Sequence, residues 1–113
     1  MAENELNEEK RKKLLMTIGL AAKAGKIICG TPLICEGLRQ KGKGKPVIVL
    51  EGSDTSENTH KRLSDKCAFY ETPLIKLPAS MSEISAAVGK TSLVAALGIK
   101  DTGLADAILS KLD

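Results

Sequence analysis

The chain alternates between stretches in which apolar residues recur every three or four positions and short runs that are apolar throughout. Helical spacing extends over residues 8–24, and Gly25 follows where a left-handed helix end belongs. The run KIIC, residues 26–29, is too short for a helix and predicts a strand. Thr31 and Pro32 then provide a hydroxyl cap and a proline at the first helical position, so a second helix is predicted over residues 32–41.

The middle of the chain continues this alternation. The segment KGKGK, residues 41–45, combines two glycines with three mutually repelling lysines and predicts an exposed basic turn. The β-branched run PVIVLE, residues 46–51, is typical of a strand that is buried on both faces of a sheet. Asp54 and Glu57 have capping-box spacing, with Asp in place of Ser or Thr, and indicate a third helix that continues to Tyr70.

The last third of the chain completes the pattern. The run TPLIKLP, residues 72–78, predicts a strand, and Ser80 and Glu83 form a capping box for a fourth helix that Gly89 ends. The run SLVAALGI, residues 92–99, predicts a fourth strand, and Asp101 caps a last helix. This order predicts an α/β fold, namely a three-layer α/β/α sandwich with a central mixed, mostly parallel four-stranded sheet.

The length of 113 residues suits one domain. We expect a flexible tail over residues 1–9 and a single domain over residues 10–113. No apolar run approaches the ~18 residues of a membrane span. The N-terminus is acidic, then basic, and contains no signal-peptide core. We therefore expect a cytoplasmic protein without a membrane partner.

Candidate catalytic chemistry is sparse. His60, the sole histidine, lies in the predicted third helix, where a surface or half-buried role is more common than catalysis. Glu51 and Asp54 flank one loop, but Asp54 already has a helix to cap. The segment GKIICGTP, residues 25–32, has the glycine spacing of a nucleotide-binding loop, with Thr-Pro where that loop needs Lys-Ser or Lys-Thr.

The three cysteines cannot all pair with one another, and each lies in an apolar pattern: Cys29, Cys35 and Cys67. We interpret them as small buried side chains. No spacing of His, Cys and acidic residues suits a metal. We expect no enzyme activity, no cofactor and no metal site.

Charge is distributed unevenly. The formal net charge is only +3, yet ten basic residues and a single acid, Glu36, lie between Lys10 and Lys45. Such a run is either a solvated face or the sequence-independent part of a phosphate-binding surface. The predicted helix start at Gly30-Thr31-Pro32 favours the second reading, because free amides and a positive dipole end attract anions. Phe69 and Tyr70 are the only aromatic residues, which argues against stacking of single-stranded bases.

Several segments, in order, resemble the ribosomal protein L7Ae/L30e superfamily, especially its small bacterial YlxQ-type members. The resemblance covers about residues 8–112 and is carried by GKIICGT, by GLRQKGKGKPVIVLEGSDTSENTHKRLSDKC and by TPLIKLPASMSEISAAVG. It implies a three-layer fold that binds structured RNA, at kink-turns in its best-known members. The resemblance gives no reason to expect DNA specificity, and it leaves open whether the ribosome is a partner.

The resemblance also implies which residues meet RNA. The loop and helix start after the first strand would meet the backbone and sheared G·A pairs, the loop after the second strand would offer a carboxylate to an extruded base, and an apolar loop before the fourth helix would pack on that base. With the basic residues as phosphate partners, the predicted RNA-binding residues are Lys26, Gly30, Thr31, Pro32, Leu33, Lys41, Lys43, Lys45, Asp54, Leu77, Pro78 and Ala79.

The chain departs from the kink-turn pattern at one place. Pro32, Leu33 and Glu36 stand where kink-turn binders of archaeal and eukaryotic type carry Asn, Glu and Lys. The polar side chains that read guanine edges are therefore missing. Two alternatives to an RNA-binding protein stay open, namely a protein-interaction adaptor on the same fold and an enzyme for a small phosphorylated ligand that would use His60.

Overall fold

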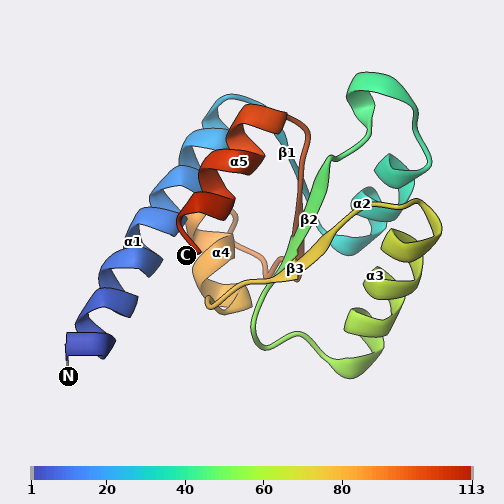
Figure 1. Cartoon of the computed structure of the whole chain (residues 1–113). Helices are drawn as coiled ribbons and strands as arrows, with labels where there is room; N and C mark the ends of the chain where they lie inside the picture. Colours follow the sequence, from blue (N-terminus) through green and yellow to red (C-terminus); the bar gives the residue numbers. More distant parts are fainter. Residues whose placement is uncertain (1, 113) are drawn as a thin grey trace.

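The computed structural model describes residues 2–112, with side chains in the first helix from residue 8 onward. Within these residues the chain forms five α-helices, four strands and one 3-10 turn (Figure 1). In chain order they are α1 (Ala2–Lys23), β1 (Ile27–Cys29), α2 (Thr31–Leu38), η1 (Gly42–Gly44), β2 (Ile48–Glu51), α3 (Glu57–Phe69), β3 (Leu74–Lys76), α4 (Met81–Ala87), β4 (Ala96–Ile99) and α5 (Thr102–Ser110).

The four strands form one mixed sheet in the order β1-β4-β2-β3. Only β2 and β3 pair in parallel, whereas β4 pairs antiparallel with both β1 and β2. The predicted mixed sheet is confirmed, but the expectation that its strand pairs are mostly parallel is wrong.

The reason lies in the connection through α4. Glu51, the last residue of β2, pairs with Lys76 at the end of β3 and with Ala96 at the start of β4. The chain thus leaves β3 and enters β4 at the same end of the sheet, so β4 runs against the other three strands. The connecting helix α4 has only seven residues, about 10 Å of helix, and the chain returns to the end of the sheet that it left. An alternating pattern of helices and strands does not reveal such a return.

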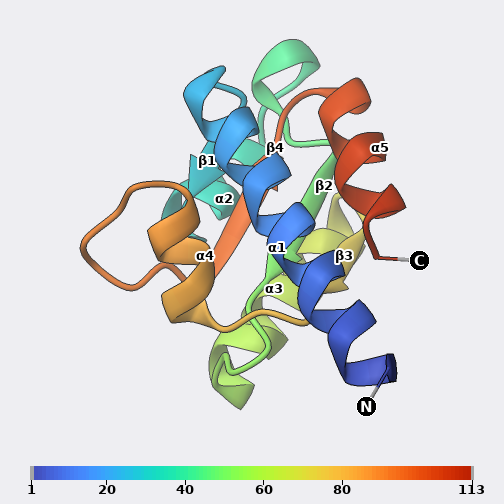
Figure 2. The same cartoon turned by 90° about the vertical axis from the view of Figure 1, so that its left-hand side faces the viewer.

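Helices cover both faces of the sheet. In Figures 1 and 2, α2 and α3 lie on one face, and α1, α4 and α5 lie on the other. The strand β2 serves both layers: Ile48 and Leu50 belong to the core cluster under α1, α4 and α5, and Val49 belongs to the cluster under α2 and α3. This alternation confirms the prediction that PVIVLE is buried on both faces.

The helix ends agree with the sequence in part. Gly25 has the predicted left-handed conformation, with φ of 72°. The Ser80–Glu83 capping box and the Asp101 cap are both formed. Asp54 does not cap α3, because Ser56 takes that position and accepts from the Thr59 N–H. The prediction for this cap was wrong.

The first helix begins at Ala2, earlier than the predicted start at residue 8. The sequence of its first turns is rich in Glu, which favours helices and suits the positive end of the dipole. The predicted flexible tail over residues 1–9 falls partly outside the described residues and stays a prediction. None of the described helices is long and apolar enough to cross a membrane.

The cysteines lie inside the fold as expected. Cys35 and Cys67 are buried, Cys29 is half-buried, and all three are free thiols. Burial, with a smaller contribution from Cys35, raises the pKa of Cys67 to about 11. The neutral thiol is therefore favoured by folding, so its contribution to stability is complete below about pH 9 and is lost as the pH rises through about 11.

Candidate nucleic-acid interface

The predicted site residues lie at two opposite ends of the sheet. We call the end where β1, β2 and β3 finish the loop edge; it comprises residues 30–33, 52–56, 77–80 and 94–95. The other end, where β1 and β2 begin and β4 finishes, we call the basic edge; it comprises residues 25–26, 41–46 and 100–103. The strand register separates them, because Ile99 pairs with Ile27 and Ile48 at one end, and Ala96 pairs with Glu51 at the other.

This division separates two groups that the sequence analysis treated as one surface. The basic edge holds the predicted phosphate partners Lys26, Lys41, Lys43 and Lys45, and the loop edge holds the other eight predicted residues. In Figure 1 the turn around η1 and the start of α5 lie at the top, and the 52–56 loop lies at the bottom. Lys26 and Gly30 flank β1, which places them about 13 Å apart at strand spacing.

Backbone hydrogen bonds join the segments of the loop edge. The Gly30 N–H donates to Ala96 O at 3.0 Å, and the Gly52 N–H donates to Ala95 O at 2.9 Å. The Ser53 N–H donates to Ala79 O at 2.8 Å. Four segments that are far apart in sequence are thus held in one fixed arrangement.

Asp54 adds a side-chain link to this arrangement. Its Oδ1 accepts from the Met81 N–H at 2.8 Å, and Met81 is the first residue of α4. The carboxylate therefore stabilises the N-terminus of α4 instead of α3. Asp54 is exposed to solvent.

Glu51, the last residue of β2, holds the loop of residues 52–56 through its side chain. Its side chain is fully buried, and its Oε2 accepts from the Thr55 hydroxyl at 2.7 Å. Its Oε1 lies 2.5 Å from Nδ1 of His60, which reaches back from the first turn of α3. Both oxygens have partners, as a buried carboxylate requires. The sequence analysis missed this cluster, because a strand residue and a helix residue nine positions apart give no signal of contact.

The start of α2 differs from the starts of the three following helices. Gly30 is its N-cap, with φ of 92° and ψ of 144°, and no side chain caps the helix. Ser56, Ser80 and Asp101 cap α3, α4 and α5 through side-chain oxygens. The first amides of α2 therefore lack a side-chain acceptor, and an anion is the ligand that such a helix end favours.

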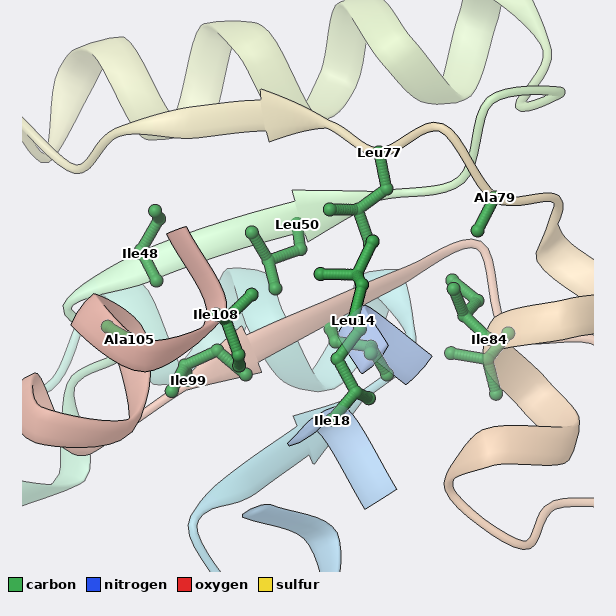
Figure 3. Packing of buried hydrophobic residues seen from close by; sticks show 12 residues of the cluster. Leu14, Ile18, Ile48, Leu50, Leu77, Ala79, Ile84, Ile99, Ala105 and Ile108 are labelled. Carbon is green, nitrogen blue, oxygen red and sulfur yellow. The ribbon is translucent and has the colours of Figure 1, made fainter. Parts of the chain in front are cut away.

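The apolar residues before α4 have different roles from those expected. Leu77 and Ala79 are each about 1% exposed and belong to the core, as Figure 3 shows, so they do not reach a ligand. Only Pro78, between them, is exposed. The expectation that all three pack on a base was wrong, because the period-two alternation of β3 continues through this segment.

One cation whose charge acts on the end of β1 was missed. The Lys90 ammonium lowers the pKa of Cys29, the last residue of β1, against the larger effect of burial, which raises it. The Lys90 backbone N–H donates to Ser85 O, so Lys90 follows directly on the end of α4. Nothing in its local sequence marked it, because its position depends on the packing of α4.

The lysines of the basic edge are not equivalent. Nζ of Lys45 donates to Tyr70 O at 2.8 Å, which places this charge at the C-terminal end of α3. Lys26, Lys41 and Lys43 are exposed.

Among the described residues, no cluster of His, Cys, Asp and Glu could hold a metal ion.

The chain is similar in sequence to a known protein family. A family model for the ribosomal protein L7Ae/L30e/S12e/Gadd45 family matches residues 12–109. The chain belongs to this family. It is similar to the RNA-binding protein YlxQ of Enterococcus faecium, with 41% identity over 88% of the chain and 91% of that protein. It is also similar to the protein of the same name from Bacillus subtilis, with 33% identity over 85% of the chain and 91% of that protein.

Solved structures show the same fold. A Bacillus halodurans protein of unknown function superposes with a TM-score of 0.78 at 28% identity, over 89% of this chain and 97% of that one. The 15.5 kD RNA-binding protein of Giardia lamblia superposes with a TM-score of 0.66 at 19% identity, over 92% and 85% of the two chains. These likenesses agree with the three-layer α/β fold.

Proposed function

We propose that this protein is a ribosome-associated, cytoplasmic RNA-binding protein that recognises structured RNA of the kink-turn kind. Family membership supports RNA as the partner, since the two similar bacterial proteins are named RNA-binding proteins. The same relationship argues against an enzyme. His60 has a structural partner, because its Nδ1 lies 2.5 Å from Oε1 of the buried Glu51.

The observation that carries the proposal is the uncapped start of α2 on a fixed loop edge. The amides of Thr31 and Leu33 and the positive end of the helix dipole offer an anion site to one phosphate. Gly30 has no Cβ, so an RNA backbone approaches this point closely. Lys90, whose charge acts on Cys29 at the end of β1, contributes further positive charge.

Next to that site, Pro78 and Asp54 form the contact for an unstacked nucleotide. The exposed Pro78 ring provides an apolar surface for a base face, and the second carboxylate oxygen of Asp54 accepts from a base N–H. Pro32 and Leu33 have no polar side chains for base edges. Recognition on this edge thus depends on backbone shape and on the extruded base.

The basic edge supplies an attraction for phosphates that is independent of RNA shape and separate from the contact at the loop edge. Lys26, Lys41 and Lys43 are exposed and release counterions when they neutralise phosphates. Lys45 contributes less, because its ammonium is held by the Tyr70 carbonyl.

A second function, a protein-interaction adaptor, is favoured by one observation. An open apolar groove of about 890 Å³ lies between α1 and α4. In it, Met16 is 70% exposed and Leu20 is 61% exposed. Exposed apolar side chains beside a groove are typical of interaction sites.

A gel shift with a kink-turn RNA and a plain duplex of equal length, across a salt series, tests the proposal. We expect tighter binding of the kink-turn, with affinity for both RNAs falling as salt rises. Equal affinity for the two RNAs at every salt concentration contradicts recognition of shape. Binding to neither RNA contradicts the function and leaves the adaptor.

A further inference from the structure

Three lysines from distant parts of the chain line one open cleft of about 540 Å³ at the basic edge: Lys26, Lys43 and Lys100. Lys26 and Lys100 lie opposite each other because the antiparallel pairing of β1 and β4 continues beyond the strands. The Lys100 N–H donates to Lys26 O at 2.8 Å. Lys43 comes from η1, which lies at the same end of the molecule as the start of α5 (Figure 1).

This arrangement is electrostatically unfavourable for the protein alone. Like charges directly opposite in an antiparallel ladder destabilise a sheet. None of the ion pairs formed by the described residues includes Lys26, Lys43 or Lys100. Asp101, the one acid among the lining residues, accepts from the Leu104 N–H as the cap of α5. The cleft therefore carries an excess of positive charge that an external anion would neutralise.

The shape of the cleft suits an extended polyanion. Lys26 and Lys43 are exposed and Lys100 is half-buried, so the charges line a surface and do not enclose a small ion. Gly25 and Gly42 flank the lysines, and open space lies where their Cβ atoms would be. A chain of phosphates approaches such glycines without a steric barrier, and the exposed Lys41 extends the charge beyond the cleft.

The cleft is spatially independent of the loop edge. The strands separate the two ends, and helical layers cover both faces of the sheet between them (Figure 2). One short, straight RNA segment on the loop edge leaves the cleft unoccupied.

We propose that this cleft is a second RNA-backbone site, so that one protein molecule holds two RNA segments at once. The inference rests on the proposed RNA-binding function and extends it from one contact surface to a bridge between two. The loop edge selects the first segment by shape, and the cleft holds the second through its phosphates alone.

The test uses the full chain with a short kink-turn RNA and an RNA duplex one helical turn long, with stoichiometry read by native mass spectrometry. A second readout is capture of a fluorescent duplex by protein bound to an immobilised kink-turn RNA. The cleft variant combines Lys26→Gln, Lys43→Gln and Lys100→Gln. The control variant, with equal loss of charge on exposed positions of α1 and α3, combines Lys12→Gln, Lys61→Gln and Lys66→Gln.

We expect two RNAs per wild-type protein and per control protein, and one per cleft variant, with at least a tenfold loss of capture in the cleft variant. Thermal unfolding of the cleft variant should occur at the same temperature as that of the wild type or at a higher one, because these side chains form no ion pair with the described residues and repel one another. Equal losses in the control variant contradict a defined cleft and indicate a generic charge effect.

The remaining outcomes separate the bridge from the proposed function. If the wild type and the cleft variant each bind one RNA, the bridge is overturned and the proposed function is kept. The cleft then suits an acidic protein segment instead of RNA. Loss of all binding in the cleft variant makes the cleft the sole site and overturns the bridge. A wild-type protein that binds no RNA overturns the bridge and the proposed function together.

Discussion

The loop edge and the basic edge of this sheet are built in opposite ways. The loop edge is held by backbone hydrogen bonds from Gly30, Gly52 and Ser53 and by the carboxylate of Asp54. The basic edge presents long, exposed lysine side chains, with few contacts, around a 3-10 turn. In the proposed function, the fixed amides and the Pro78 ring select an RNA shape, whereas the exposed ammonium groups attract any phosphate. Shape selectivity and electrostatic attraction would then be carried by separate parts of one small domain.

Substitution of the buried Glu51 should have the largest effect on the stability of the loop edge. In Glu51→Ala, Thr55 and His60 lose the acceptor that a fully buried side chain provides, so we expect a loss of about 2 kcal/mol of unfolding free energy. Urea unfolding measures this loss. Asp65→Ala, at an exposed position of α3, is the control and should change stability by less than about 0.5 kcal/mol. Equal midpoints for the two variants would show that Glu51 does not support the loop.

Thr31→Asp breaks the anion site without breaking the fold. A carboxylate at the first residue of α2 suits the helix dipole, so stability should be kept or rise by a few tenths of a kcal/mol. The same charge repels a phosphate, and we expect kink-turn affinity to fall by about tenfold, or about 1.4 kcal/mol. Gel shift measures the affinity, and the neutral Thr31→Val is the control. Unchanged affinity in Thr31→Asp would remove α2 from the interface.

Two substitutions of Asp54 distinguish its structural role from its proposed role in RNA binding. Asp54→Ala removes the acceptor of the Met81 N–H and should cost about 1 kcal/mol of stability. Asp54→Asn keeps an oxygen for Met81 but replaces the second oxygen with an N–H₂ donor. We therefore expect near wild-type stability and weaker kink-turn binding in Asp54→Asn. If Asp54→Asn binds the kink-turn as well as wild type does, the carboxylate serves only the fold.

Substitutions of Lys43 and Lys45 at the basic edge should have small and different effects. Lys43→Gln should lower the slope of log affinity against log salt by about one, because one phosphate contact is lost. Lys45→Gln should change this slope less but lower stability by about 0.5–1 kcal/mol, because the bond to Tyr70 O is lost. A salt series and urea unfolding distinguish the two. Identical effects on slope would mean that Lys45 also meets phosphates.

Local patterns predicted most elements of the fold. Helical spacing, the Ser80–Glu83 capping box and the Asp101 cap depend on near neighbours, and the structure contains all of them. The strand order depends on the return through α4, which has no local signal. Asp54 was predicted as the cap of α3, but Ser56 takes that role and Asp54 contacts Met81, 27 residues away.

The candidate site was less accessible to sequence reasoning. The alternation of Ile75, Leu77 and Ala79 was visible and could have identified Leu77 and Ala79 as core residues. The Glu51–His60 contact, the position of Lys90 and the convergence of Lys26 with Lys100 arise only when distant segments pack together. A run of basic residues in the sequence therefore did not reveal the division into two edges.

The division between the edges is tested most directly by one salt series, with a kink-turn RNA and a plain duplex, on wild type, Thr31→Asp and the cleft variant. We predict that Thr31→Asp loses the kink-turn preference with little change in the salt slope for duplex. The cleft variant should keep the preference while its duplex slope falls by about three. Loss of the preference in the cleft variant, or an equal change of slope in both variants, would contradict the account.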